Sequence, residues 1–232
     1  CINCTRCIRF AEEVAGTPVL GQFGRGEDAE VGTYIDEIVS TELSGNLVDI
    51  CPVGALTSKP YKYKARSWEL KKTETIDVHD ALGCNIRVDS RGREVMRILP
   101  RLNEDINEEW IDDRARYSYD GLSNARLDRP YIRDDESGKL KEASWSEAFD
   151  FIKTKLSSVK SSEIAALAGN LVDVETMTSM KDLLAAIGSP HMDCRTDGAF
   201  LSTDSRASYI FNSTIAGIDE ADAILLIGTN PR

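Results

Sequence analysis

Four of the six cysteines are spaced in a way that restricts how the first part of this chain can fold. Cys1, Cys4 and Cys7 form a C-x2-C-x2-C motif, and Cys51 follows after 43 intervening residues and precedes Pro52. Tight turns between closely spaced thiolates direct their sulfurs at one centre, and a fourth ligand must then come from elsewhere in the fold. Pro52 has a fixed φ and no N–H group, which favours an extended loop around Cys51.

The cysteine spacing leaves three interpretations. A [4Fe–4S] cube is favoured, because three cysteines at consecutive x2 spacing suit its corners. Zinc sites usually present two separated C-x2-C pairs, so zinc is the main alternative. Structural cysteines are the third, although Thr5 and Arg6 leave little apolar surface around them. Because the chain has no second C-x2-C-x2-C motif, we expect Cys51 to complete the same cube. Backbone N–H groups of residues 2–7 and 53–55 would donate to its sulfurs.

Composition argues against several classes of function. A net charge of −11 and a pI near 4.8 disfavour binding to nucleic acid and electrostatic adhesion to an anionic membrane. No apolar run approaches the roughly 18 residues of a transmembrane helix, and no signal or transit peptide is visible. Six cysteines are too few for a disulfide scaffold, so their clustering indicates metal and a reducing compartment. Because the chain begins at a predicted ligand without an initiator methionine, we expect a fragment of a longer polypeptide.

The chain divides into three stretches, and 232 residues with 41% hydrophobic content allow each to bury a small core. Residues 1–72 carry the cysteine motif, residues 73–129 are rich in strand-forming residues, and residues 130–232 alternate strand and helix patterns. The elements predicted for the first stretch are a helix over residues 5–14, a loop with Gly21, Gly24 and Gly26, a strand over residues 33–39 and a helix before Cys51.

The second stretch is predicted to be a small β-rich unit. Strand-forming residues occur at 74–79, 84–88 and 94–99, and residues 89–92 have the composition of a hairpin turn between the last two strands. Residues 107–119 are polar and are expected to be helical only in part.

The third stretch is predicted to be α/β. Ser144 and Glu147 form a capping box at the start of one helix, and Asp173 caps a second helix that ends at Gly188. The predicted elements are a helix from 145 to about 159, a strand over 164–168, a helix over 174–188 and a strand over 221–227. Alternating strands and helices imply a parallel sheet, so the predicted fold class of the whole chain is α+β to α/β.

Longer motifs extend along nearly the whole chain. They are CINCTRCIRF at residues 1–10, EVAG at 13–16, VGTYI at 31–35, ELSGNLVDICPVGALTSKP at 42–60, ARSWEL at 65–70, NEEWI at 107–111, YDGL at 119–122 and LLIGTNPR at 225–232. Together they resemble the large iron–sulfur subunit of respiratory complex I, the NADH:quinone oxidoreductase, which is the 75 kDa subunit of the mitochondrial enzyme and has a bacterial counterpart.

This resemblance implies an electron relay without a substrate site of its own. The chain would hold one [4Fe–4S] cluster on Cys1, Cys4, Cys7 and Cys51 and pass electrons from NADH and FMN towards quinone, as part of a translocating oxidoreductase. Further clusters are expected only in the N-terminal part of the family's subunit. The implied domains are a ferredoxin-like segment, a small domain resembling the 4Fe-4S domain of molybdopterin enzymes, and the start of a molybdopterin-oxidoreductase-like α/β domain.

The resemblance also implies partners and a location. The expected partners are the flavin-containing NADH-oxidising subunit and the quinone-side iron–sulfur subunit of the peripheral arm. The expected location is peripheral on the inner membrane, at the bacterial cytoplasmic face or the mitochondrial matrix face.

The second stretch is not expected to hold a cluster. Some family members have an additional one there, and its ligand positions fall in this sequence at Asp77, Asp80, Cys84 and Asp112. Carboxylates are poor ligands for an iron–sulfur cube beside one thiolate, so we predict no second cluster. Cys84 is then expected to be a buried structural cysteine. We also expect no molybdopterin, because a shared fold does not carry activity with it.

Two other functions remain open. One is the accessory electron-transfer part of a formate dehydrogenase or hydrogenase, and the other is a zinc-stabilised interaction module. The motifs at residues 107–122 and 228–232 favour the complex I family over the first of these. His79 and His191 have no partner at ligand spacing and are expected to play structural roles.

Overall fold

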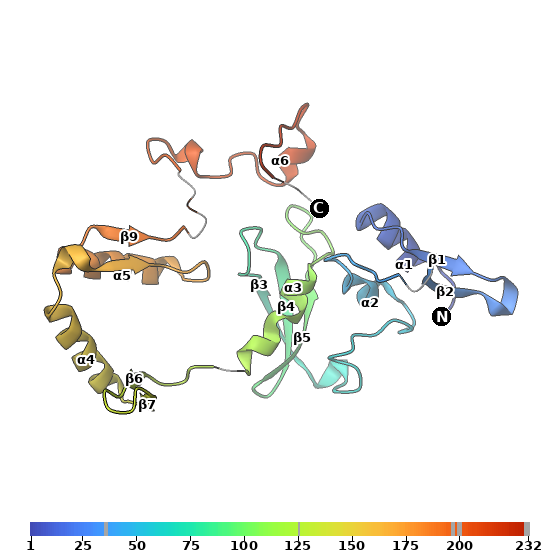
Figure 1. Cartoon of the computed structure of the whole chain (residues 1–232). Helices are drawn as coiled ribbons and strands as arrows, with labels where there is room; N and C mark the ends of the chain where they lie inside the picture. Colours follow the sequence, from blue (N-terminus) through green and yellow to red (C-terminus); the bar gives the residue numbers. More distant parts are fainter. Residues whose placement is uncertain (35–36, 125, 196–197, 199–200, 230–232) are drawn as a thin grey trace. The chain divides into compact units, whose positions relative to one another are not determined.

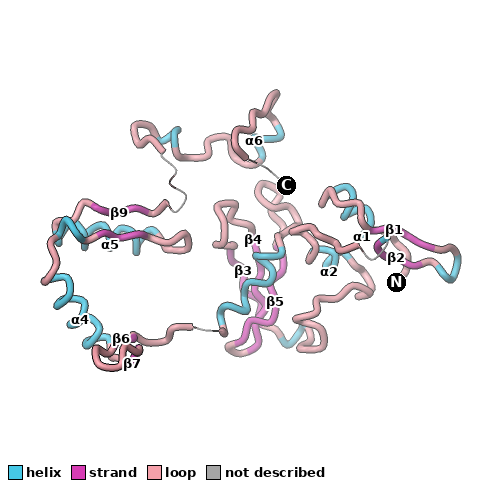
Figure 2. The backbone as a smooth tube through the Cα atoms, viewed as in Figure 1, coloured by secondary structure: helices cyan, strands magenta, loops and turns pink. Residues whose placement is uncertain are grey.

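The structure is a computed structural model that describes residues 1–34, 37–124, 126–195, 198 and 201–229. Its helices and strands, which Figures 1 and 2 show along the chain, fall into two compact units. The first unit comprises the residues up to Asn124 and those from Ser213 onward, and the second comprises the residues in between. The mixture of helices and strands agrees with the predicted α+β class.

The chain begins with a short helix. α1 (Arg6–Arg9) continues directly into a π-helical turn, η1 (Phe10–Val14), which confirms the helix predicted over residues 5–14. Phe10 is buried, and its ring lies 4.8 Å from that of Trp110. This contact anchors the helix that follows the cysteine motif.

An antiparallel hairpin of β1 (Leu20–Phe23) and β2 (Glu30–Thr33) follows. Gly21, which was predicted to lie in a loop, is paired with Gly32 in this hairpin, since strand pairing needs only the backbone.

The strand predicted over residues 33–39 is wrong beyond Thr33, because residues 37–39 have no regular structure. Residues 35–36 lie outside the described part of the chain. The last pair of the hairpin joins Thr33 to Leu20, and Pro18 has no N–H group with which to extend it.

α2 (Asn46–Ile50) ends directly before Cys51, as predicted. It is only five residues long, and two of these, Asn46 and Leu47, are buried. The helix therefore depends on its neighbours for stability.

A three-stranded antiparallel sheet forms the next part of the first unit. β3 (Lys71–Ile76), β4 (Asn85–Arg91) and β5 (Glu94–Pro100) lie side by side in this order (Figure 1). Three strands form where three were predicted, although the first spans residues 71–76 rather than 74–79, so the prediction is wrong for residues 77–79. The hairpin turn lies at residues 92–93 rather than 89–92, because β4 continues through a bulge at Asp89.

Asp89 explains why the strand continues. Its side chain is fully buried, and its two oxygens accept hydrogen bonds from Arg87 Nε at 2.9 Å and from Arg97 Nε at 2.8 Å. The Arg97 guanidinium also lies 4.6 Å from the centre of the Tyr61 ring. Charge-assisted bonds from two strands hold this carboxylate inside the sheet, whereas the sequence pattern of Asp, Ser and Gly predicts a turn.

The hydrophobic core of the first unit lies between this sheet and α3 (Asp113–Tyr117). Its buried members are Cys84, Ile86, Ile98, Ile111 and Ala115. A 3₁₀ helix, η5 (Ser118–Leu122), follows α3 directly, so the partly helical character predicted for residues 107–119 is confirmed.

In the described residues, the second unit contains two α-helices and four short strands. In chain order they are β6 (Tyr131–Arg133), β7 (Leu140–Glu142), α4 (Trp145–Ser157), β8 (Ala165–Leu167), α5 (Val174–Ile187) and β9 (His191–Asp193). The predicted helix caps are confirmed. Ser144 and Glu147 bond each other's backbone N–H groups, Asp173 accepts from the Thr176 N–H at 2.7 Å, and Gly188 ends α5 with φ 81°.

β8 and β9 pair in parallel, which confirms the strand predicted over 164–168 and the expected parallel pairing. β9 itself was not predicted, because three residues are too few to show a period. β6 and β7 pair antiparallel. The remaining short helices are η2 (Gly26–Asp28), η4 (Ser67–Glu69), η6 (Ser161–Glu163), η7 (Arg206–Ser208) and α6 (Ala216–Asp219).

The strand predicted over residues 221–227 is wrong, because these residues form no ladder. The side chains of residues 224–227 are all more than half exposed. An apolar run becomes a strand only where a neighbouring backbone accepts its hydrogen bonds, and no strand of the described residues does so here. The end of the last sequence motif, residues 230–232, lies outside the described residues.

No helix in the described ranges has both the length and the apolar character needed to cross a membrane.

Replacing Asp89 by alanine should destabilise the first unit, because Arg87 and Arg97 then lose their shared carboxylate. Removing one partner of a buried ion pair costs about 3–5 kcal/mol. The two arginines are partly exposed, so we expect a loss of about 2–3 kcal/mol in the free energy of unfolding. Denaturant unfolding followed by circular dichroism measures this loss.

The control is Glu74→Ala, which removes an exposed carboxylate 3.6 Å from Arg101 and should cost less than about 1 kcal/mol. Equal costs for the two variants would show that the buried position of Asp89 is not what stabilises the sheet.

Candidate metal centre

The four cysteines of the spaced motif line one cavity of about 300 Å³ in the first unit. Cys4, Cys7 and Cys51 are partly buried, and Cys1 is exposed. The rest of the wall is mainly apolar, with contributions from the hairpin, from α2 and from the loop after Cys51. The apolar lining residues are Ile2, Leu20, Val31, Val39, Leu47, Pro52, Val53, Ala55 and Leu56. Thiols from two distant parts of the sequence therefore line a single cavity with a mainly apolar wall.

The loop that carries Cys1, Cys4 and Cys7 has an unusual backbone. Asn3 and Thr5 adopt φ values of 49° and 59°, in the left-handed region that non-glycine residues rarely occupy. Two such residues between three cysteines curl the chain tightly enough to line one cavity with their thiols.

Asn3 holds this loop in place. Its N–H donates to Cys1 Sγ at 3.3 Å, and its side-chain amide donates to the Ala29 carbonyl at 3.1 Å. The second bond ties the cysteine loop to the β1–β2 hairpin. Nothing in the sequence pattern alone pointed to Asn3, because its partner is 26 residues away.

Cys51 stands at the end of α2, where the backbone turns from helical to extended. The loop after it reverses direction at Gly54, which has a φ of 65°. The Leu56 N–H makes the largest contribution to lowering the pKa of the Cys51 thiol. Burial opposes this shift, and the N–H groups of residues 53–55 reinforce it. Residues 53–55 are expected to donate to the sulfurs of a bound cube, and in the structure their N–H groups, together with that of Leu56, act on the Cys51 thiol itself. These donors favour the thiolate, which is the metal-binding form.

The four positions where we predict that no second cluster binds, Asp77, Asp80, Cys84 and Asp112, also lie close together. Cys84 is buried, and its thiol pKa is raised to about 11, first by burial and then by the charges of Asp80, Asp112 and Asp77. The three aspartates and the cysteine therefore lie in one neighbourhood, and the prediction that Cys84 is buried is confirmed.

Each of these carboxylates is bonded within the protein. Asp77 lies 2.5 Å from His79 Nδ1, Asp80 accepts from the Leu82 N–H at 2.9 Å, and Asp112 caps α3. His79, for which we predict a structural role, has Asp77 as its partner. Elsewhere, His191 lies in β9, and Cys194 is exposed.

In the ranges that the structure describes, no three His, Cys, Asp or Glu side chains converge as the ligands of one metal ion do.

Three family models match successive parts of the chain. The ferredoxin-like domain of NADH-quinone oxidoreductase subunit 3 matches residues 1–57. The NADH-ubiquinone oxidoreductase NDSU1/NuoG-like 4Fe-4S domain matches residues 70–120, and the molybdopterin oxidoreductase family matches residues 126–232. Two iron–sulfur domains and a molybdopterin-oxidoreductase-type domain are thus present, although Cys84 is the only cysteine in residues 70–120.

Curated relatives match the chain over its full length. It is 57% identical to the G subunit of the NADH-quinone oxidoreductase of Rickettsia conorii. It is 54% identical to the mitochondrial NADH dehydrogenase [ubiquinone] iron-sulfur protein 1 of Solanum tuberosum, and 54% identical to the mitochondrial 78 kDa subunit of NADH-ubiquinone oxidoreductase of Candida albicans. The chain spans 34%, 31% and 32% of these proteins, about a third of their length. The resemblance proposed from the sequence motifs is confirmed.

The raised pKa of Cys84 predicts slow alkylation. Only the thiolate reacts, so the labelling rate of Cys84 by iodoacetamide should rise about tenfold per pH unit and level off only near pH 11. The exposed Cys194 is the internal control and should react far faster at pH 7.5. Peptide mass spectrometry after timed labelling of the folded protein measures both rates. Equal labelling of the two cysteines at pH 7.5 would contradict the buried, carboxylate-lined site.

Proposed function

We propose that this chain, which matches the large iron–sulfur subunit of NADH:quinone oxidoreductase along its whole length, relays electrons through one [4Fe–4S] cluster held by Cys1, Cys4, Cys7 and Cys51. The observation that carries the proposal is that these four thiols line one apolar cavity. Each iron of a cube takes one thiolate, so a cube needs thiols around a volume rather than at one point. The cavity and its four thiols fit that requirement.

The residues of the chain have three tasks in this proposal. The four thiolates bind the cluster, which supplies a one-electron redox couple when bound. The N–H groups of residues 53–56 stabilise negative charge at the Cys51 sulfur. The apolar wall limits access of water, which together with such hydrogen bonds influences the reduction potential of a cluster.

The proposed place in the reaction follows from the family. Electrons arrive from the flavin-containing subunit that oxidises NADH and leave towards quinone through another iron–sulfur subunit. The chain contributes to the peripheral arm at the cytoplasmic or matrix face of the membrane. We assign no NADH-oxidising or quinone-reducing step to its own residues.

We further propose that residues 73–129 and 130–232 support the cluster segment without cofactors of their own. Asp77, Asp80 and Asp112 offer hard oxygen ligands that suit neither an iron–sulfur cube nor its sulfide-rich surroundings. Each already has a hydrogen-bond or ion-pair partner in the protein. The match to the molybdopterin oxidoreductase family describes a shared fold, and we propose that this domain is a scaffold without the pterin.

Iron and acid-labile sulfide analysis of the anaerobically purified protein tests the proposal. About four iron and four sulfide should be found for this part of the chain. Cys51→Ser should abolish or strongly reduce both, because the fourth thiolate is lost. Cys194→Ser is the matched control and should leave both unchanged, since Cys194 is exposed and lies in the other unit.

Three results would contradict the proposal. One zinc without sulfide would indicate a zinc-stabilised module. About eight iron and eight sulfide would show that residues 77–112 hold a second cluster after all. A bound pterin would favour an enzyme of the formate dehydrogenase type.

A further inference from the structure

Cys51, the fourth predicted ligand, directly follows α2, a helix too short to be stable by itself. α2 has five residues, far fewer than the roughly 12–15 that an isolated helix needs in water. The residue at its N-cap, Gly45, has no side chain that could cap its start. The position of Cys51, directly after α2, must therefore be set by contacts from other parts of the chain.

Asn46 provides one set of such contacts. It is fully buried, and its amide nitrogen donates to the carbonyls of Leu43 at 3.0 Å and of Ile111 at 2.8 Å. Its amide oxygen accepts from the Ile111 N–H at 3.2 Å and from Arg116 at 2.8 Å. The first residue of α2 is thus bound to the segment that leads into α3.

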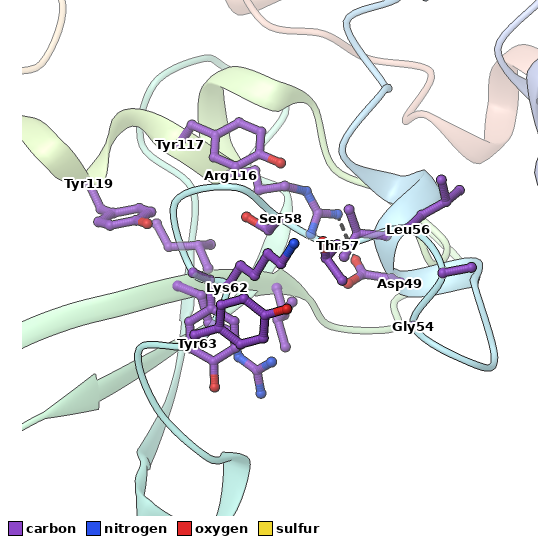
Figure 3. Close-up of a pocket in the computed structure, with 16 residues that line it drawn as sticks. Asp49, Gly54, Leu56, Thr57, Ser58, Lys62, Tyr63, Arg116, Tyr117 and Tyr119 are labelled. Carbon is purple, nitrogen blue, oxygen red and sulfur yellow. Dashed lines mark ion pairs between the residues drawn. The ribbon is translucent and has the colours of Figure 1, made fainter. Parts of the chain in front are cut away.

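Arg116 contacts the other end of the helix. It is 4% exposed, and the same Nη2 that bonds Asn46 also lies 2.7 Å from Asp49 Oδ2. Figure 3 shows the Arg116 side chain reaching from α3 to Asp49 beside the loop of Leu56 and Thr57. Asp49 is two residues before Cys51. A single buried guanidinium therefore joins the start of α2 to its last turn.

Asp113 completes the arrangement. Its two oxygens accept from Ser44 Oγ at 2.5 Å and from the Gly45 N–H at 2.6 Å, and its own N–H donates to the Glu42 carbonyl at 2.7 Å. We call Asn46, Asp49, Asp113 and Arg116 the α2–α3 clasp.

Gly45 shows how closely the clasp is packed. Its φ of −64° is ordinary for any residue, so the backbone does not require glycine. A Cβ atom there would lie 2.5 Å from Arg116 Cδ, 2.6 Å from Arg116 Nε and 2.7 Å from Asp113 Oδ1. Glycine is needed because the clasp occupies the space of a side chain.

We propose that the α2–α3 clasp, through Arg116, positions the Cys51 sulfur towards the cavity and so determines the geometry of the bound cluster. This inference rests on the proposed function. Arg116 is a positioning residue, because it acts through α2 and does not line the cysteine cavity. Residues beyond the direct ligands commonly matter in this way, and their mutation typically costs roughly 10–100-fold in metal affinity.

The test compares Gly45→Ala with Gly121→Ala in the protein purified anaerobically with its cluster. Gly121 has no atom within 4 Å of an added Cβ and lies in a short helix, so it is a matched control. We expect Gly45→Ala to change the paramagnetic resonance spectrum of the reduced cluster and to raise the rate of iron loss to a chelator at least tenfold. Gly121→Ala should behave like the parent protein.

Arg116→Lys provides a second, milder variant. It keeps the positive charge, but its ammonium nitrogen ends one bond short of the Nη2 position that contacts both Asn46 and Asp49, so it should also alter the spectrum. Thermal unfolding followed by circular dichroism reports the fold of each variant separately. If both variants lose the cluster while the fold persists, the inference is supported.

Two results would overturn the inference. An unchanged spectrum and unchanged iron loss in both variants would show that the clasp does not position Cys51, even if the melting temperature fell. Unfolding of both variants would show a purely structural role. If the parent protein itself contains no iron and sulfide, the proposed function fails, which is a different outcome from failure of the clasp alone.

Discussion

The organisation of the first unit depends on one buried side-chain amide. The side chain of Asn46 makes four hydrogen bonds, and three of them reach residues more than 60 positions away in the sequence. If the amide lost these partners, each unpaired buried atom would lower the free energy of unfolding by about 1–3 kcal/mol. The amide therefore fixes the approach of α2 to the segment before α3. It joins the stretch that carries the cysteines to the stretch that carries the three-stranded sheet, so the two behave as one unit.

The three-stranded sheet is the rigid part of the first unit, and the predicted ligands lie outside it. The sheet holds its own buried charge, Asp89, between two arginines, and it packs its apolar face around Ile86, Ile98 and Ile111. Ile111 also exchanges both of its backbone bonds with Asn46. The hydrophobic core thus continues directly into the polar contacts that support α2. A helix of five residues is too short to be stable alone, and α2 is held in position by its contacts with residues that pack on the sheet.

Features that depend on residues close together in the sequence could be predicted, whereas features that depend on contacts between residues far apart in the sequence could not. The capping box at Ser144, the cap at Asp173 and the end at Gly188 were predictable because each involves residues within one or two turns. The role of Arg116 was not, since its partners at 46 and 49 are remote in sequence. The composition of residues 89–92 predicts a turn that includes Asp89. The bonds from Arg87 and Arg97 show that Asp89 instead belongs to the sheet. The four cysteines could be chosen from spacing, whereas the Leu56 N–H could not.

The surroundings of two cysteines of the first unit shift their thiol pKa values in opposite directions. Around Cys51, backbone N–H groups favour the thiolate, while around Cys84 burial and three aspartates favour the neutral thiol. A thiol must lose its proton to bind a metal, so the first environment promotes ligation and the second opposes it. The carboxylates at 77, 80 and 112 therefore have two effects in this neighbourhood. They raise the free energy of the thiolate at Cys84, and they tie this part of the chain together through their own bonds to His79, Leu82 and Ala115.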